Sequence, residues 1–356
     1  MNRSIIITGL DIGSSKVSAV ALELFNTGRS VILAYESQPS KGINRGVLTD
    51  IAEASNSVAK VLTRLGAKTL KGADNIYANI SGESVMGERS KGMIPLSSRG
   101  REVTNSDITR CVNAASTIRL AYDREVIHKI VLSFSIDDQP PIKNALDLYA
   151  SRLSCEMYMI TANLNHIQNI YKCVNDAGYD VKEVVYSGIA DSVSLLEEAW
   201  KDEGAALINM GASLTELSYF SGGALSFLDI MPLGGSDIKG GIKDDGRFNE
   251  MASRIKSRTE EFLKKGGSVR SFIITGGLAF SEGVAETLEE RLGCPVRMGT
   301  VRNVQGNISS TDGLRAVTAI GLARYAASVY QTRSAQAKTI ARKISNKVVE
   351  IFNNYF

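Results

Sequence analysis

Two short stretches of the chain carry residue types that could bind a phosphate group. The stretches are LDIGSSK and INMGASL, and each places an acid or amide, a glycine and a serine at the same spacing: Asp11, Gly13 and Ser15 in the first, Asn209, Gly211 and Ser213 in the second. A glycine at a tight turn lets backbone N–H groups approach a phosphate, a serine hydroxyl adds a donor, and a carboxylate on the incoming strand can hold a hydrated metal ion. The sequence therefore predicts two phosphate-binding hairpins that face each other across a cleft.

The surroundings of the two stretches repeat as well. Each predicted hairpin is followed by a helix and then by a further strand; the helices are expected at 51–66 and 249–265, and the strands at 75–81 and 271–277. A single motif of this kind is also typical of a purely structural turn. Because the whole unit occurs twice, the pattern favours a duplicated α/β architecture with a ligand site between its halves.

A segment between the two repeats has its own pattern of helix and strand. Its helix opens at Thr104 with Asp107 three residues on, which is a capping box, and a strand is expected at 126–137. This segment is predicted to be a small inserted α/β domain. The predicted division of the chain is 1–82 for the first core subdomain, 83–157 for the insertion, 158–330 for the second core subdomain with a reduced insertion at 236–274, and 331–356 for a linker and a C-terminal helix.

Composition limits the class of protein. The chain has 356 residues, of which 44% are hydrophobic and 22% are charged, values that are ordinary for a soluble globular protein. Its four cysteines and two histidines show neither metal-ligand nor disulfide spacing, so no metal site is expected and a reduced cytosol fits best. No stretch reaches the roughly 18 apolar residues of a spanning helix, and a net charge of +3 gives no reason to expect a nucleic-acid partner.

The C-terminal stretch AKTIARKISNKVVEIFNNYF predicts an amphipathic helix. Its apolar residues recur at spacings of three and four, and its cations take the other side. Such a helix suits a membrane interface, because the apolar face enters the acyl boundary while the cations meet anionic headgroups. An ordinary helix docked on the protein core is the alternative. The predicted membrane-binding residues are Ile340, Arg342, Lys343, Ile344, Lys347, Val348, Ile351, Phe352, Tyr355 and Phe356.

Several segments resemble, in order and spacing, the FtsA family of bacterial cell-division proteins in the actin superfamily. They include LDIGSSK, GINRGVLTDI, SFSIDDQPPIKN, IMPLGGSDI and FIITGGLAFSEGVAETLEERLGCPVRMG. The resemblance covers nearly the whole chain and implies an actin-like, ribonuclease H-like fold, an ATP site with Mg²⁺ in the cleft, filament formation, and attachment of FtsZ polymers to the membrane. The nucleotide-binding residues that it implies are Asp11, Gly13, Ser14, Ser15 and Lys16 at the first phosphate loop, Asn209, Gly211, Ala212 and Ser213 at the second, and Gly276 and Gly277 beside the adenosine.

The second phosphate loop departs from the family pattern. The family has DIGGGTTD there, whereas this chain has NMGASLTE. Asn209 in place of Asp removes a negative charge that would hold hydrated Mg²⁺, and restoring Asp there is expected to strengthen Mg²⁺-nucleotide binding. Ala212 and Ser213 place Cβ atoms where the backbone must approach a phosphate. About 40 residues separate LGGSD from ITGG, where the family carries a further subdomain that binds the base and the FtsZ tail.

These observations predict a divergent FtsA-like adaptor. It is expected in the cytoplasm, peripheral on the inner face of the cell membrane, where it attaches FtsZ-type filaments or other division proteins to an anionic membrane surface and can polymerise. No catalytic residue is assigned, and at most a slow ATPase is expected. Two alternatives stay open: an active ATPase or kinase of the actin superfamily, against which Asn209 argues, and an FtsA-related scaffold of a pilus assembly machine, which the short segment 236–274 favours.

Overall fold

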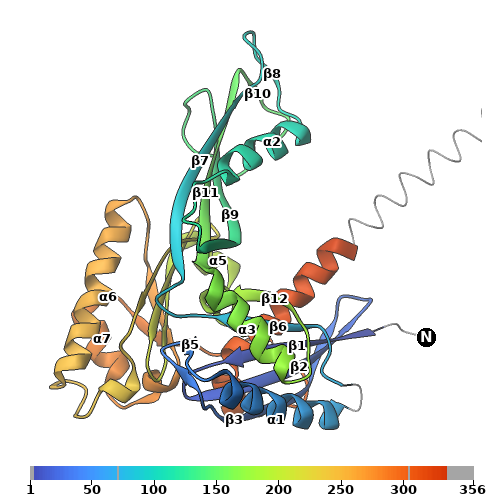
Figure 1. Ribbon diagram of the computed structural model, residues 1–356. Coiled ribbons are helices and arrows are strands. Elements are labelled where there is room, and N and C mark those ends of the chain that lie inside the picture. Colours follow the sequence, from blue (N-terminus) through green and yellow to red (C-terminus); the bar gives the residue numbers. More distant parts are fainter. Residues whose placement is uncertain (1–3, 70–71, 304, 335–356) are drawn as a thin grey trace, which may run out of the picture.

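The computed structural model describes residues 4–69, 72–303 and 305–334 (Figure 1). The predicted membrane-binding helix at 340–356 lies outside the described residues. Within them, none of the helices has the length and apolar character needed to cross a membrane.

Two five-stranded sheets form the core of the molecule. The first has the order β12-β6-β1-β2-β3, and the second has the order β15-β14-β13-β16-β17. In both, an antiparallel hairpin provides the central strand, and this strand pairs in parallel with the strand that follows the helix. The predicted duplication is therefore confirmed. The strands are β1 Ser4–Ile12, β2 Lys16–Phe25, β3 Ser30–Pro39, β6 Ile76–Ile80 and β12 Val181–Tyr186 in the first sheet, and β13 Ala205–Met210, β14 Thr215–Ser221, β15 Ala224–Met231, β16 Ser271–Thr275 and β17 Val296–Met298 in the second.

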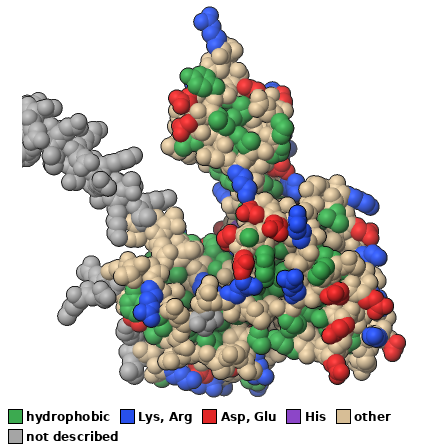
Figure 2. All heavy atoms as spheres, turned by 180° about the vertical axis from the view of Figure 1, so that it is seen from behind, with side chains coloured by type: hydrophobic (Ala, Val, Ile, Leu, Met, Phe, Trp, Pro, Cys, Tyr) green, Lys and Arg blue, Asp and Glu red, His purple; other side chains and the backbone are tan. Residues whose placement is uncertain are grey.

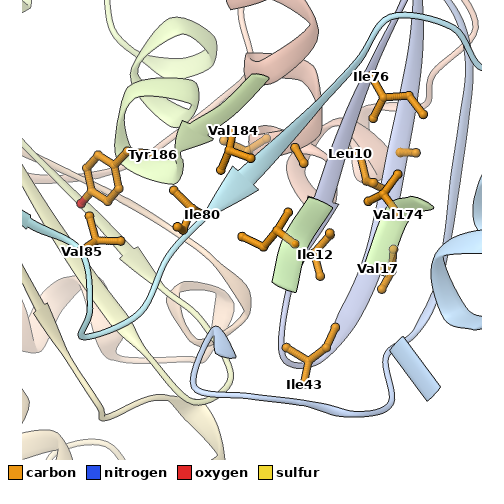
Figure 3. Packing of buried hydrophobic residues seen from close by; sticks show 14 of the residues in the cluster. Leu10, Ile12, Val17, Ile43, Ile76, Ile80, Val85, Val174, Val184 and Tyr186 are labelled. Atoms are coloured by element: carbon orange, nitrogen blue, oxygen red, sulfur yellow. The ribbon is translucent and has the colours of Figure 1, made fainter. Parts of the chain in front are cut away.

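Helices cover both faces of the first sheet. Helices α1 (Ile51–Thr69) and α3 (Leu164–Asp176) lie on one face, where Val61, Leu62 and Leu65 of α1 are fully buried. Each such side chain stabilises the fold by about 1.5–3 kcal/mol. Figure 3 shows the sheet side of this core, with Leu10 on β1 and Val17 on β2 among its side chains. The other face is covered by a helix at 317–334.

The second sheet has a core of its own. Helices α6 (Gly246–Lys264) and α7 (Val284–Leu292) pack against it, and the aromatic side chains of Tyr219, Phe248 and Phe262 are buried between them and the sheet. Asp245 caps α6 by accepting hydrogen bonds from the Arg247 and Phe248 amides. Between β15 and β16, α6 is the one α-helix.

The inserted domain stands apart from the core on a narrow neck (Figure 2). Its three-stranded antiparallel sheet has the order β7-β11-β9, and α2 packs on that sheet. Helix α2 begins after Thr104, and the predicted capping box with Asp107 is present. Strand β11 continues to residue 163, past the predicted end of the insertion at 157. The elements are β7 Met86–Pro95, β8 Arg101–Glu102, α2 Asn105–Ser116, β9 Arg124–Ile136, β10 Tyr149–Ala150 and β11 Arg152–Asn163.

The predicted second core subdomain at 158–330 needs a correction. Strand β12 pairs in parallel with β6 of the first sheet, and α3 packs on α1. The helix at 317–334 also joins the first half, where Tyr330 Oη donates to Asn75 Oδ1 at 2.8 Å and Tyr325 Oη donates to Glu183 Oε1 at 2.9 Å. The first half is thus assembled from three separate stretches of the chain.

Helix α4 (Ser187–Leu195) lies where the two halves meet, because it follows β12 of the first sheet and contacts β13 and β14 of the second. The remaining short elements are β4 Ile43–Asn44, β5 Val47–Leu48, α5 Glu198–Glu203, η1 Gly235–Asp237, η2 Gly277–Phe280 and α8 Ser310–Arg315.

Candidate functional site

A cavity of about 820 Å³ lies between the two halves. This volume is within the range of small-molecule sites in proteins. The cavity is lined by every nucleotide-binding residue predicted from the sequence, namely Asp11, Gly13, Ser14, Ser15, Lys16, Asn209, Gly211, Ala212, Ser213, Gly276 and Gly277.

The two hairpin turns are closed in the same way. Gly13 N donates to the carbonyl of Lys16 at 3.0 Å, and Gly211 N donates to the carbonyl of Leu214 at 2.9 Å. A Cβ atom on either glycine would lie only 3.0 or 3.1 Å from that carbonyl oxygen, so a larger residue would crowd the turn at both positions. Among the described residues, the amides of the next two residues in each turn donate to no other backbone group. Backbone donors therefore face the cavity from both sides.

The carboxylate of the first hairpin, Asp11, is held by its neighbours. Asn79 Nδ2 donates to Asp11 Oδ1 at 3.0 Å, while Asn79 Oδ1 accepts from the Ile12 amide at 2.7 Å. Burial raises the pKa of Asp11, and the nearby Lys16 partly opposes this effect. Asn79 is on β6, and sequence reasoning did not find it.

The ammonium of Lys16 donates to the backbone carbonyl of Arg315, at the end of α8. Burial lowers the pKa of Lys16. The side chain thus spans from the first hairpin to the C-terminal segment.

The amide of the second hairpin, Asn209, covers a buried carboxylate. Its Nδ2 donates to Asp191 Oδ2 at 2.7 Å, and Thr318 Oγ1 donates to Asp191 Oδ1 at 2.7 Å. Asp191, on α4, is fully buried, and burial raises its pKa to about 7. The carboxyl group that position 209 lacks is therefore present one hydrogen bond behind it. The signal in the sequence was a single acid in the otherwise apolar or small run SGIADSVSLL.

A further carboxyl group, that of Glu216, faces the cavity from β14. Glu216 pairs with Asn209 in the hairpin and is 6% exposed. Burial raises its pKa to about 8, and the neighbouring Asp191 adds to the increase, so the group is protonated at neutral pH. Glu216 was not among the predicted site residues either.

The far end of the cavity is formed by loops of the second half. Gly235 N donates to the Gly211 carbonyl at 2.9 Å and Ser236 N donates to the Ala212 carbonyl at 2.8 Å, so the LGGSD segment supports the second turn. Leu278 and Phe280 of η2 line the same end, and Phe280 is 47% exposed. Apolar side chains at the end remote from Lys16 suit the base of a nucleotide better than its phosphates.

These residues fit an anionic ligand better than they fit a bare metal ion. In the part of the chain that the structure describes, His, Cys, Asp and Glu side chains form no group of three that could hold a metal. Among the described residues, Asp11 and the protonated Glu216 are the acids that line the cavity, whereas Asp191 does not line it. A Mg²⁺ ion that arrives with a nucleotide needs only one or two carboxylates, because phosphates and water complete its shell.

Comparison with known proteins identifies relatives of this chain. Residues 82–161 match the family described as the SHS2 domain inserted in FTSA. The protein named cell division protein FtsA from Borreliella burgdorferi is 27% identical over 402 aligned positions, which cover 98% of this chain and 96% of that protein. The protein of the same name from Pseudomonas aeruginosa is 25% identical, over 90% of this chain and 88% of that protein. The Borreliella alignment is longer than this chain, so the relative has segments that this chain lacks.

Solved structures agree on the fold. A chain of the PilM–PilN type IV pilus biogenesis complex superposes with a TM-score of 0.68 at 15% identity, covering 90% of this chain and 98% of that one. The ethanolamine utilization protein EutJ from Carboxydothermus hydrogenoformans superposes with a TM-score of 0.51 at 12% identity, covering 90% and 89%. The fold is the actin-like ATPase fold. The inserted domain at 82–161 and the similarity over nearly the whole chain make this protein a divergent homologue of the proteins named cell division protein FtsA.

Proposed function

We propose that this protein is an FtsA-type adaptor that binds an adenine nucleotide between its two hairpins, assembles with copies of itself, and attaches FtsZ-type filaments or other division proteins to the inner face of the cytoplasmic membrane. The observation that carries the proposal is the pair of equivalent hairpins around one cavity, in a chain with an FtsA-type insertion. The relatives named as cell division proteins supply the cellular process.

The first turn is the better equipped of the two for phosphates. It offers the amides and hydroxyls of Ser14 and Ser15, and Lys16 of the same turn lines the cavity, as does Arg315. ATP, when bound, would supply the phosphates for these donors and an Mg²⁺ ion for Asp11, with its adenosine beside Gly276 and Gly277. Binding therefore depends more on residues 13–16 than on residues 211–213.

Hydrolysis is proposed to be slow because, among the described residues, neither carboxyl group beside the second hairpin is suited to act as a base, and Asp11 is assigned to the Mg²⁺ ion. Attack by water on a phosphate is helped by a group that accepts a proton within hydrogen-bond reach. Glu216 is already protonated at neutral pH, and Asp191 is occupied by two hydrogen bonds behind Asn209. Phosphate release from ATP at about one per second or faster, a typical enzyme rate, would favour the alternative of an active ATPase or kinase.

Self-assembly is proposed to be head-to-tail through the core subdomains, with the inserted domain contributing to the contact. Such a contact does not close on itself and so builds a filament. Electron microscopy of the protein on a lipid monolayer tests this. Only dispersed monomers at high surface density would contradict it.

The membrane contact is assigned to the C-terminal segment at 340–356. Each nearby cation contributes about 1 kcal/mol on anionic lipid, and each buried CH₂ group contributes about 0.8 kcal/mol. Phe352→Glu should abolish binding to vesicles of any composition, whereas Lys343→Ala with Lys347→Ala should weaken it mainly on anionic vesicles at low salt. Vesicle sedimentation measures both. A truncation after Gln336 that unfolds would show that the segment belongs to the core.

The cellular role is tested by imaging a tagged full-length protein in its host. A band at the division site that disappears when FtsZ is depleted is the expected result, and truncation after Gln336 should leave the protein diffuse. The alternative, a scaffold of a pilus machine, predicts that FtsZ depletion changes nothing. The fold likeness to the pilus complex alone does not favour that alternative over the sequence relatives.

A further inference from the structure

A two-residue turn enters the cleft between the two phosphate-binding hairpins. Strands β4 and β5 pair antiparallel, so that only Arg45 and Gly46 connect them. Both residues have positive φ, 48° and 72°, as in a type I′ turn. Gly46 lines the cavity. This turn therefore forms part of the cleft wall, although it belongs to neither predicted phosphate loop.

The turn contacts one serine from each hairpin. Gly46 N–H donates to Ser14 Oγ at 3.1 Å, and Arg45 N–H donates to Ser213 Oγ at 3.1 Å. Each hydroxyl oxygen accepts from the turn, which leaves its hydrogen free to point elsewhere. In the described residues, neither hydroxyl donates to another protein group. Two hydroxyl donors on opposite sides of a cavity suit the oxygens of a single phosphate.

His166 holds this turn from behind. It lies on α3, is 5% exposed, and places Nε2 at 3.0 Å from the Gly46 carbonyl. A carbonyl can only accept, so Nε2 carries the proton. Burial lowers the pKa of His166 and keeps the ring neutral, so Nδ1 accepts, and its donor is Ser84 Oγ at 2.7 Å. In the chain of hydrogen bonds from Ser84 through His166 and Gly46 to Ser14, each residue thus donates to the next one.

Ser84 lies at the neck of the inserted domain, where three segments of the chain meet. Its carbonyl accepts from Arg124 Nη2 at 2.8 Å, and the same nitrogen donates to the Thr161 carbonyl at 3.0 Å. Arg124 begins β9 and Thr161 lies near the end of β11. The turn also packs directly on this neck, since a Cβ atom on Gly46 would lie 3.1 Å from the Gly82 nitrogen.

The hydrophobic core continues along the same path. Ile43, at the base of the turn, and Val85, at the neck, belong to one cluster that also contains Ile12 of the first hairpin and Ile80 of β6 (Figure 3). A shift of the turn is therefore opposed by packed side chains at both ends rather than absorbed by a loose loop.

We propose that the Arg45–Gly46 turn is a third element of the phosphate site, and that His166 is the positioning residue that couples it to the inserted domain. This inference rests on the nucleotide site proposed above. A phosphate that engages the hydroxyls of Ser14 and Ser213 fixes the turn, and the hydrogen bonds through His166 transmit that restraint to Ser84. Because coupling between two sites is reciprocal, a contact made by the inserted domain changes the affinity for nucleotide in turn.

The test combines calorimetric titration of full-length protein with Mg²⁺-ADP and hydrogen exchange measured by mass spectrometry with and without the nucleotide. His166→Ala should weaken binding by about tenfold, which corresponds to about 1.4 kcal/mol. His166→Gln keeps a donor for the Gly46 carbonyl and should restore most of the affinity. Ser84→Ala should bind normally but lose the nucleotide-dependent slowing of exchange at residues 82–85.

His128→Gln is the matched control, because His128 is similarly buried near the neck but binds the Tyr186 amide instead of the turn. It should retain both the affinity and the exchange response. Unchanged affinity in His166→Ala, or an intact exchange response in Ser84→Ala, would overturn the inference and leave the nucleotide site standing. If the wild-type protein binds neither ADP nor ATP, the proposed nucleotide site itself is wrong, and this inference is overturned with it. If His166→Ala does not fold, the Ser84→Ala exchange result decides.

Discussion

In the hairpin of β1 and β2, the carboxylate Asp11 stands on the incoming strand opposite Ser18, whereas in the hairpin of β13 and β14 the amide Asn209 stands there opposite the carboxyl of Glu216. The partners differ as well. Asp11 receives a hydrogen bond from Asn79 on the neighbouring strand β6, while Asn209 gives one to Asp191 on α4. The turns themselves close through the same hydrogen bond.

The comparison separates two kinds of constraint. Each of the two turns has a glycine whose Cβ atom would lie only 3.0 or 3.1 Å from a carbonyl oxygen, so this steric constraint is nearly the same in both halves. The charge beside each turn depends on whether the acid or the amide occupies a given position, and the two can change places as long as each buried group keeps a hydrogen-bond partner. In the second half the amide Asn209 lines the cavity, and the acid Asp191 lies on its other side, away from the cavity. The two hairpins can therefore keep one shape and still hold different ligand groups.

The largest effect is expected from Asn209→Asp alone. Two buried carboxyl groups would then lie at hydrogen-bond distance, and at most one could ionise. The folded protein would retain a proton that the unfolded chain has lost, so its stability falls as pH rises. We expect a loss on the order of 3 kcal/mol at pH 8 and a smaller loss at pH 5. Urea unfolding of the double variant Asp191→Asn with Asn209→Asp, which restores one acid and one amide, should give nearly wild-type stability.

Asp191→Asn should stabilise the protein at alkaline pH. The folded-state pKa of Asp191 is about 7, against an ordinary value of 3.8, so between these pH values the folded wild-type protein binds more protons than the unfolded chain. Wild-type stability therefore falls as pH rises through this window and then levels off. The advantage of the variant should reach a few kcal/mol at pH 8 and vanish near pH 4. If the variant exceeded the wild type in stability by the same amount at pH 8 and pH 4, the raised pKa of Asp191 in the folded protein would be contradicted.

Lys16→Ala should weaken nucleotide binding by about 10- to 100-fold, because a charge-assisted hydrogen bond contributes about 1.5–3 kcal/mol. Lys243→Ala, in an exposed turn before α6, is the matched control and should bind as the wild type does. Titration with Mg²⁺-ADP measures both. Equal affinity of the two variants would mean that the Lys16 ammonium stays on the Arg315 carbonyl when the nucleotide is bound.

The double variant Asp191→Asn with Asn209→Asp should bind Mg²⁺-nucleotide more tightly than the wild type, by about tenfold. Position 209 lines the cavity and position 191 does not, so the exchange moves an acid to where it can meet the metal. The gain should disappear when Mg²⁺ is removed with EDTA. This corrects the expectation that Asn209→Asp alone would strengthen binding, since Asp191 was not visible in the sequence as its neighbour.

The smallest effects should come from the two turn serines. Ser14→Ala and Ser213→Ala each remove one neutral hydroxyl and should weaken nucleotide binding by a few-fold, since a typical hydrogen bond contributes about 1 kcal/mol. Ser14→Ala should have the larger effect, because its turn also carries Lys16. Parallel titrations of the two variants measure the difference. A larger loss in Ser213→Ala would reverse the ranking of the two hairpins.

The duplication and the acid or amide, glycine and serine of each turn could be predicted because they depend on short-range signals, whereas the other predicted cavity residues came from the resemblance to a known family. A glycine, a serine and an acid or amide at fixed spacing identify each turn, and the repeat identifies its partner. Asp191 could not be found in this way, because its role follows from a contact between α4 and β13 that joins separate elements. The Arg45–Gly46 turn contains a glycine, which is typical of a two-residue hairpin turn. Its position in the cleft wall, however, depends on the fold of the whole chain.

The domain boundaries show the same limit. The predicted subdomains are continuous stretches of the chain. Strand β12, however, follows the inserted domain in sequence and pairs with β6, which precedes that domain. Parallel pairing of this kind needs a long crossover and leaves no mark in the local pattern of either strand. The tail at 340–356 lies outside the described residues, so its predicted helix stays a prediction.

The division of the first sheet among three stretches of the chain has a consequence for how the protein is made. The hydrophobic cluster between the second sheet and helices α6 and α7 draws only on residues between 206 and 298, so this cluster can form as soon as that continuous stretch has been synthesised. The first sheet needs β12 and the helix at 317–334 to cover Ile7 and Leu22. Because such long-range contacts form slowly, the N-terminal hairpin emerges from the ribosome first and is completed last. Until then its apolar strands are exposed, so aggregation is avoided only if a chaperone covers them or folding is completed quickly.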